Sequence, residues 1–328
     1  MNINEKNLKE IDIFSFQQLK NFRKDDFYSL GMVFIFLFVS FFSIALYALW
    51  QQEILNEGYF FVGWTLLTHE LTFILLNLFM IILYTKRYRF FEAFRLVKFN
   101  NEVKVEESFN ISILLKILPT IIINHFFTFP IMLLPFLTGN FCPFSITRES
   151  FPNPFKLILH LLFYMLMHEL SYYWINKMAH LNINVVIFLT KYRNGLNNEY
   201  NDSDYSFISD YQHPFVYLVL FIFPSNLGPF LLGGRTHLSS YLIWIIFLTL
   251  ARNEFYSGYN FPWSIVSIIP YSANTEFHVF NRKYNNGNYG FLFAISDAVC
   301  GTMSIEYLHH LQKQLKEYKE YKSHAKTN

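Results

Sequence analysis

Long apolar runs separated by short polar segments set the pattern of this chain. Four of these runs are long enough to cross a bilayer as helices, and they cover residues 30–50, 59–84, 113–137 and 155–175. A helix needs about 20 residues to span the ~30 Å hydrocarbon core. The pattern therefore predicts an all-α, polytopic membrane protein with about four transmembrane helices.

Two shorter apolar runs, at residues 215–232 and 238–250, are interrupted by proline and glycine. A Gly233-Gly234 pair lies between them. Irregular backbone is tolerated at membrane depth only where protein or a cavity covers it. The pattern is compatible with a hairpin that enters the bilayer or with two buried helices, and the sequence leaves both open.

Lysine and arginine lie on both sides of the first predicted hairpin and are absent from its turn. Five precede residue 30, six lie within residues 86–104, and residues 51–58 carry none. By the positive-inside rule, both ends of this hairpin face the cytosol. A second hairpin then returns the chain to the cytosol near Lys177, so we expect both the N-terminus and the C-terminus to be cytosolic.

These features divide the chain into four expected regions. Residues 1–28 form a cytosolic N-terminal segment that lacks the apolar core of a cleaved signal peptide. Residues 29–111 form the first transmembrane hairpin and a basic cytosolic loop. Residues 112–304 contain the second hairpin and a cytosolic helical cap, and residues 305–328 form a charged tail.

Composition supports this class and excludes others. Hydrophobic residues make up 53% of the 328 residues, aromatic residues 20% and charged residues only 15%, which is too apolar for an ordinary soluble domain. A net charge of +2 without a basic patch argues against a nucleic-acid partner. The two cysteines, Cys142 and Cys300, form no CxxC spacing, so they predict neither a disulfide frame nor a zinc site.

The segment from Tyr256 to Trp263, Tyr-Ser-Gly-Tyr-Asn-Phe-Pro-Trp, is the most informative motif. It resembles the His-Ser-Gly-Tyr-Asp-Phe-Pro-Trp segment of the C4-methylsterol oxidases, in the membrane fatty acid hydroxylase/sterol desaturase superfamily. Asn124-His125-Phe126 and the Gly287-Asn288-Tyr289 segment resemble further parts of the same pattern, and the resemblance covers residues 117–302. It implies a protein of the endoplasmic reticulum membrane, with two irons held by histidines in the cap.

The resemblance assigns ten positions of this chain to histidine ligands of the superfamily. Histidine remains at three of them, His180, His213 and His278. The other seven are Asn176, Asn194, Asn197, Asn198, Tyr256, Asn281 and Arg282. The carboxylates that stand beside this frame as candidate donors are Glu169, Asp210 and Glu276. A neutral amide oxygen is a weak ligand for non-haem iron, and an arginine in the pocket repels a bound cation.

Two function classes follow from these substitutions. In the first, the protein is a degenerate, methylsterol-oxidase-like pseudoenzyme without catalytic residues or cofactor, which binds a sterol or other membrane lipid or scaffolds sterol-pathway membrane enzymes. In the second, it is a divergent but active iron-dependent C4-methylsterol oxidase, and His180, His213 and His278 carry the metal. We favour the first class because the motif frame is retained while most of its ligands are replaced.

One ionisable pair, His69-Glu70, lies inside the second long apolar run. Ionisable residues within a membrane span are costly, and they are usually functional or paired with one another. A kink that opens the pair to solvent is the alternative, and the sequence does not separate the two. His168-Glu169 begins like a zinc-binding HExxH motif but lacks its second histidine, which favours a structural role for this pair.

Overall fold

The computed structural model describes residues 57–96, 111–182, 184–188 and 205–327, with side chains to residue 316. The first predicted span, residues 30–50, lies outside this part of the chain. In the described residues the fold is helical, with isolated β-bridges and no β-ladder. The all-α, polytopic class predicted from the sequence is confirmed.

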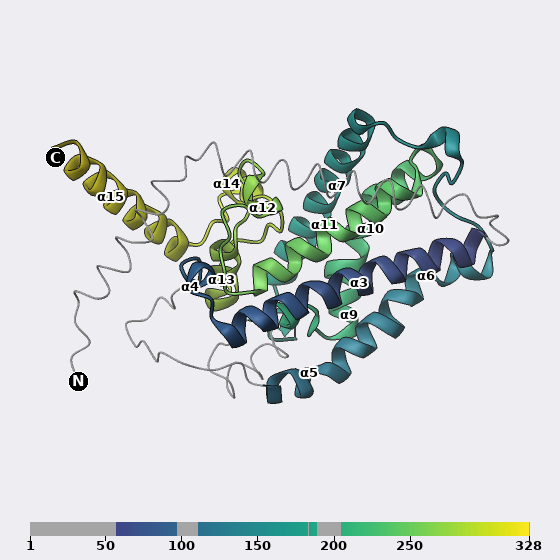
Figure 1. Ribbon diagram of the computed structural model, residues 1–328, viewed down its shortest axis with the longest axis horizontal. Helices are drawn as coiled ribbons and strands as arrows, with labels where there is room; N and C mark the ends of the chain where they lie inside the picture. The colour runs from purple at the N-terminus through teal and green to yellow at the C-terminus, as the bar shows by residue number, and fades with distance from the viewer. Residues whose placement is uncertain (1–56, 97–110, 183, 189–204, 328) are drawn as a thin grey trace.

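The elements follow one another as a series of long helices joined by short turns (Figure 1). The α-helices are α3 (Glu57–Lys86), α4 (Arg89–Glu92), α5 (Ile111–Ile123), α6 (Phe129–Thr138), α7 (Pro154–His180), α9 (Pro214–Tyr217), α10 (Phe223–Leu232), α11 (Leu238–Tyr256), α12 (Ile265–Ile268), α13 (Thr275–Tyr284), α14 (Ile295–Cys300) and α15 (Ile305–Thr327). Two π-helical turns are η1 (Asn124–Thr128) and η4 (Leu218–Ile222), and three 3₁₀ turns are η2 (Arg148–Ser150), η3 (Ser206–Asp210) and η5 (Gly233–Arg235).

Three helical segments of the described residues are long and apolar enough to cross a membrane. They are Glu57–Lys86, Ile111–Thr138 and Pro214–Arg235. The first two coincide with predicted spans. The third contains the run at residues 215–232, so it forms a continuous helical segment in spite of its prolines. The predicted span at residues 155–175 is the helix α7, but His160, His168 and Glu169 lower its apolarity, and it is not among the three.

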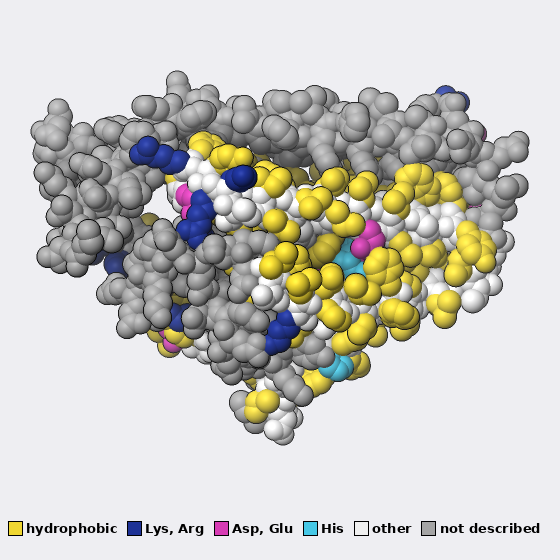
Figure 2. Space-filling model, turned by 60° about the horizontal axis from the view of Figure 1, so that its bottom comes forward, with side chains coloured by type: hydrophobic (Ala, Val, Ile, Leu, Met, Phe, Trp, Pro, Cys, Tyr) yellow, Lys and Arg dark blue, Asp and Glu magenta, His cyan; other side chains and the backbone are white. Residues whose placement is uncertain are grey.

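The outward faces of these segments are hydrophobic. Four side chains of α3 are each about half exposed, namely Leu67, Leu71, Ile74 and Leu78. Their spacing of three and four residues places them on one face of the helix. Figure 2 shows a broad hydrophobic surface of this kind, in which an acidic and a histidine side chain emerge together. An apolar exterior around a polar interior is the arrangement expected of helices surrounded by lipid.

Helix α11 lies at the centre of the fold. It packs against α3, α7, α13 and η3, and its large side chains such as Trp244 and Tyr241 are fully buried. Figure 1 shows α3 and α6 side by side across the molecule, with α12, α13 and α14 gathered beyond one end of α11. Because α11 joins the two regions, it fixes the position of this cap relative to the long helices.

The Tyr256–Trp263 motif attaches the cap to the chain that follows α3. Gly258 adopts a φ of 74°, a left-handed conformation that favours glycine, and its carbonyl accepts a hydrogen bond from Leu96 N at 2.8 Å. The Tyr259 hydroxyl donates to Glu92 Oε1 at 2.6 Å. The retained motif therefore has a structural role that requires no metal.

The π-helical turn η1 interrupts the segment Ile111–Thr138. Its wide turn is closed by a hydrogen bond from Phe129 N–H to the Asn124 carbonyl. The adjacent residues Asn124 and His125 are both buried and both contact the chain around Asp210. Single π-helical turns of this type occur frequently at functional sites.

Candidate functional site

Four of the ten ligand-type positions meet at one cavity in the cap. Tyr256 ends α11, and His278, Asn281 and Arg282 lie on α13 at helical spacings of three and four residues. The side chain of Asn274 caps α13 by accepting from Phe277 N at 2.9 Å, which begins the helix ahead of these three residues. The cavity is small, and its other lining residues are Tyr172, Gln212, Leu220, Arg252 and Phe291.

Two asparagines of the frame donate hydrogen bonds to backbone carbonyls. Asn176 Nδ2 donates to the carbonyl of Tyr289 at 3.0 Å, and Asn281 Nδ2 donates to the carbonyl of Gly287 at 2.7 Å. Both acceptors belong to the Gly-Asn-Tyr segment. The amide groups at these ligand-type positions therefore hold a loop of the cap in place.

Arg282 lies over another substituted position. Its guanidinium carbon lies 4.5 Å from the centroid of the Tyr256 ring, and its Nη1 donates to the Phe255 carbonyl at 2.8 Å. This stacked arrangement is a cation–π contact. A fixed positive charge thus occupies the side of the cavity where the superfamily pattern has histidine.

His278 is buried and neutral. Its Nε2 donates to the Phe291 carbonyl at 2.9 Å, and its ring centroid is 4.0 Å from that of Phe255. Burial, together with the positive charge of Arg282, lowers the pKa of His278 to about 3. The imidazole is therefore in its neutral form throughout the physiological pH range.

The other two retained histidines lie in different surroundings. His180 is the last residue of α7, with its Nδ1 2.8 Å from the Asn176 carbonyl oxygen and its ring 4.8 Å from that of Tyr289. His213 caps α9, where its Nδ1 accepts from Phe215 N at 3.2 Å. Asn194, Asn197 and Asn198 lie outside the described residues.

The three candidate carboxylate donors are each engaged elsewhere. Glu169 accepts hydrogen bonds from the backbone N–H groups of Phe291, Leu292 and Phe293 at 2.7 to 3.3 Å. Glu276 lies beside His310 of α15, with a separation of 3.5 Å between Oε2 and Nε2. Asp210 forms part of a separate network of charged groups.

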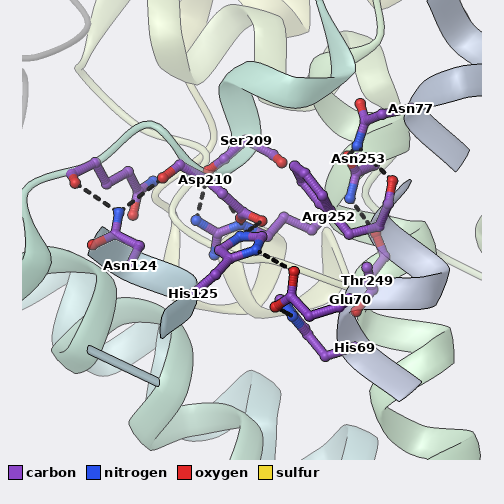
Figure 3. Close-up of polar contacts among 12 residues, drawn as sticks. His69, Glu70, Asn77, Asn124, His125, Ser209, Asp210, Thr249, Arg252 and Asn253 are labelled. Atoms are coloured by element: carbon purple, nitrogen blue, oxygen red, sulfur yellow. Dashed lines mark hydrogen bonds and ion pairs between the residues drawn. The ribbon is translucent and has the colours of Figure 1, made fainter. Parts of the chain in front are cut away.

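This network, which we call the buried charge network, consists of His69, Glu70, His125, Asp210 and Arg252 (Figure 3). Glu70 Oε1 is 3.0 Å from His69 Nδ1, and Glu70 Oε2 is 3.0 Å from His125 Nδ1. Asp210 Oδ2 lies 3.0 Å from His125 Nε2, while its Oδ1 lies 2.6 Å from Arg252 Nε. The network links α3, η1, η3 and α11.

Arg252 is the fixed cation of the network. It is 4% exposed, its Nη2 donates to the Ser209 carbonyl at 2.6 Å, and its guanidinium lies 4.0 Å from the centroid of the Phe221 ring. Burial alone raises the pKa of Asp210, but Arg252 and His125 outweigh it and lower this pKa to about 2. Asp210 is therefore ionised and paired.

The sequence points to several residues of this network but not to the contacts between them. The sequence marks His69-Glu70 as an ionisable pair in an apolar run and His125 as part of a motif, but it connects neither of them with Arg252. The network joins residues up to 183 positions apart in the chain (69 and 252). An arginine near the end of an otherwise apolar helix was the signal that could have suggested a buried carboxylate partner.

Among the described residues, one group of His and carboxylate side chains brings three ligand atoms together. It consists of His69, Glu70 and His125, whose ligand atoms all lie within 4.8 Å of one another. The group contains none of the three histidines of the cap frame. The assignment of His180, His213 and His278 as residual metal ligands stays a prediction.

Comparison with known proteins shows which family the C-terminal half of the chain resembles. Residues 161–302 match the family model described as fatty acid hydroxylase. This part of the chain is similar to the fatty acid hydroxylase family. The cavity-lining residues of the frame, from Tyr172 to Phe291, lie within this match. The superfamily resemblance found in the sequence is thereby confirmed.

Curated relatives of this superfamily carry more than one activity in their names. Very-long-chain aldehyde decarbonylase GL1-11 of Oryza sativa subsp. indica is 28% identical over 243 residues, which are 73% of this chain and 84% of the relative. Methylsterol monooxygenase 1-3 of Arabidopsis thaliana is 27% identical over 187 residues, 54% of this chain and 61% of the relative. Methylsterol monooxygenase erg25A of Aspergillus fumigatus is 25% identical over 189 residues, 56% and 60% of the two chains. No solved structure matches significantly.

The neutral state of His278 predicts an acid-sensitive fold. Unfolded histidine takes up a proton near pH 6.5, whereas folded His278 does so only near its pKa of about 3. The free energy of unfolding therefore falls as pH is lowered from about 6.5 towards 3, by up to about 1.4 kcal/mol per pH unit. Between pH 7 and pH 5 we expect His278→Gln to lose about 2 kcal/mol less stability than wild type, measured by chemical denaturation in detergent.

The exposed His309 provides the control for this measurement. His309→Gln is expected to keep the wild-type dependence on pH, because the ring is on the surface of α15. Equal loss of stability between pH 7 and pH 5 in wild type and His278→Gln would contradict the assignment of a depressed pKa to His278.

Proposed function

We propose that the protein is a non-catalytic homologue of the methylsterol monooxygenases that binds a sterol or similar membrane lipid. Hydrogen bonds take the place of a diiron centre in holding its cap together. The observation that carries this proposal is the hydrogen bonding of the substituted frame, in which Asn176, Asn281 and Arg282 each donate to a backbone carbonyl. We place the protein in the endoplasmic reticulum membrane with cytosolic termini.

The ligand-type positions that the structure describes do not provide the donors that a diiron site needs. Members of this superfamily are typically diiron-dependent, and a diiron site needs several imidazole or carboxylate donors with lone pairs directed at the metals. Arg282 has no lone pair to offer, and it brings a positive charge into the same cavity. Glu169 and Glu276 are bound to other groups. Polar groups paired in this way allow the cap to fold without metal.

A second cavity, among the long helices, supports lipid binding. It is small and lies between α6, η4, α10 and α11, beside His69. Its apolar walls include Phe129, Phe221, Ile222, Ile245 and Leu248, and its polar groups include Ser225, Asn226, Tyr241 and Thr249. The chemistry of this lining, mostly apolar with a few polar groups, matches an apolar skeleton that carries a hydroxyl, as a sterol does. A sterol enters only if the lining side chains move apart, because the space now left between them holds about one water molecule. The same features suit a protein that assists lipid-modifying membrane enzymes without chemistry of its own.

The absence of a diiron centre is tested by iron content. We expect the full chain, purified in detergent and incubated with Fe²⁺ under anaerobic conditions, to retain no iron that depends on the cap histidines. Wild type and the double variant His180→Gln/His278→Gln should then bind equal amounts, measured by elemental mass spectrometry. About two irons per chain in wild type, lost in the double variant, would overturn the proposal and favour an active C4-methylsterol oxidase.

Lipid binding is tested by photo-crosslinking with a diazirine-bearing sterol in detergent or nanodiscs. We expect saturable labelling of wild type and at least a several-fold reduction in Leu248→Phe, since Leu248 lines the apolar cavity and a larger side chain fills it. Leu231→Phe, on the exposed side of α10, is the matched control and should label like wild type. Labelling that is not displaced by unlabelled sterol, or that is equal in both variants, argues against this cavity as the lipid site.

A further inference from the structure

The buried charge network contains a set of metal-ligand side chains that lies outside the cap frame. His69 and Glu70 come from α3 and His125 from η1, and the two histidines are each 2% exposed (Figure 3). Their ligand atoms lie within 4.8 Å of one another. We propose that His69, Glu70 and His125 bind one divalent ion of the zinc class, at the level of the membrane-spanning helices.

The distances between donor atoms suit such an ion. Glu70 Oε1 and Oε2 lie 3.0 Å from His69 Nδ1 and His125 Nδ1, respectively. In a tetrahedral zinc site with bonds of about 2.0–2.1 Å, neighbouring donor atoms are about 3.4 Å apart. Each nitrogen–oxygen pair therefore needs to separate by only a few tenths of an ångström to reach the donor spacing of a zinc site. The two ring centroids are 4.8 Å apart, so a change in the orientation of the His69 ring would bring its Nδ1 to the same ion while His125 keeps its contact with Asp210.

Asp210 orients His125 in the way that metal sites require. Its Oδ2 lies 3.0 Å from His125 Nε2, and its other oxygen is held by Arg252. A proton on Nε2, donated to Asp210, leaves a lone pair on Nδ1, on the side of Glu70. A carboxylate on the far nitrogen of a ligating histidine is a recurring feature of metal sites, and it also raises the basicity of the imidazole.

The competing occupant of the site is a proton. If both nitrogens of His125 donate to carboxylates, His125 is an imidazolium, and its charge together with that of Arg252 balances Glu70 and Asp210. An ion in place of that proton leaves one net positive charge, which a bound hydroxide neutralises. His69 also borders the small apolar cavity, which has room for about one water molecule, so space for this fourth ligand lies beside it.

The surroundings favour binding of an ion by these side chains. Two histidines from separate helices direct their Nδ1 atoms at one carboxylate, at the middle of two membrane-spanning segments where isolated charges are costly. Glu70 is 19% exposed on the outer side. In Figure 2, an acidic and a histidine side chain emerge together through the hydrophobic surface.

The proposal is tested with Co²⁺ and Zn²⁺ on the purified full chain in detergent. We expect one Zn²⁺ per chain after equilibration and desalting, and Co²⁺ should give visible absorption bands of a tetrahedral nitrogen and oxygen site. His69→Gln and Glu70→Gln should each weaken binding at least ~100-fold, and Asp210→Asn, a positioning variant, about 10- to 100-fold. His160→Gln, a buried histidine of α7, is the matched control and should bind like wild type.

Two further measurements keep the outcome decisive. X-ray absorption of the zinc-loaded wild type should show two imidazoles and no sulfur ligand, which does not depend on the folding of any variant. The cap variant His180→Gln/His278→Gln should retain the ion, and this separates the site from a metal centre in the cap. No bound ion in folded wild type, or loss of the ion in the cap variant, overturns the proposal and leaves His125 as a buried imidazolium.

Discussion

Arg252→Met is expected to lower the free energy of unfolding by about 3–5 kcal/mol, because it leaves a buried carboxylate without its cation. Asp210 is 1% exposed, and its Oδ1 lies 2.6 Å from Arg252 Nε. The substitution also removes the hydrogen bond from Arg252 Nη2 to the Ser209 carbonyl. The measurement is the unfolding temperature of the detergent-purified chain, which should fall by about 6 °C or more.

Two further variants test whether the loss of stability comes from the unpaired charge of Asp210. Arg235→Met removes an exposed arginine of η5 and should change stability by no more than about 0.5 kcal/mol. The double variant Arg252→Met/Asp210→Asn should be more stable than Arg252→Met alone, since it no longer buries an uncompensated charge. If Arg252→Met resembles Arg235→Met, the pair does not contribute to stability in the way that its burial indicates.

Glu169→Leu is expected to have the second large effect, a loss of about 3 kcal/mol or more in the free energy of unfolding. Glu169 accepts hydrogen bonds from three successive N–H groups, those of Phe291 to Phe293. Leucine has similar bulk but no acceptor, so these buried donors lose their partner. Hydrogen exchange followed by mass spectrometry should show faster exchange in residues 287–293.

The matched control for this prediction is Glu149→Leu, at an exposed position of η2. It should leave both stability and exchange in residues 287–293 at wild-type values. Gly290 offers an independent check, because a Cβ at this position would approach the Phe293 carbonyl oxygen to 2.5 Å and Glu169 Oε1 to 2.8 Å. Gly290→Ala should therefore loosen the same loop. Unchanged exchange in Glu169→Leu contradicts a role for Glu169 in anchoring it.

The sequence was sufficient to predict the fold class and one side of the cap cavity. Apolar runs gave the segments now seen as α3 and Ile111–Thr138, since run length is set by bilayer thickness. Motif spacing brought His278, Asn281 and Arg282 to one face of α13, because residues three and four apart share a helix face. Spacing within one helix can therefore be predicted from the sequence.

Contacts between distant parts of the chain were not predictable in the same way. Nothing in the local pattern of Asp210 or Arg252 indicates that they meet, or that His125 lies between Asp210 and Glu70. These pairings depend on how the helices pack, which periodicity does not encode. The superfamily resemblance accordingly suggests Asp210 as a carboxylate ligand for a metal in the cap, whereas the structure pairs it with Arg252 and His125.

The π-helical turn at Asn124–Thr128 sets the rotation of one whole helical segment. Buried side chains before it, at Ile113, Ile117 and Ile121, advance in steps of four residues, and Phe129 and Leu133 continue this spacing after it. Each such step drifts about 40° around a regular α-helix, so Ile113 and Leu133 would lie on nearly opposite faces. The additional residue in the wide turn offsets about half of this drift. A length change of one residue at this turn would thus rotate all of α6 and turn its buried side chains towards lipid.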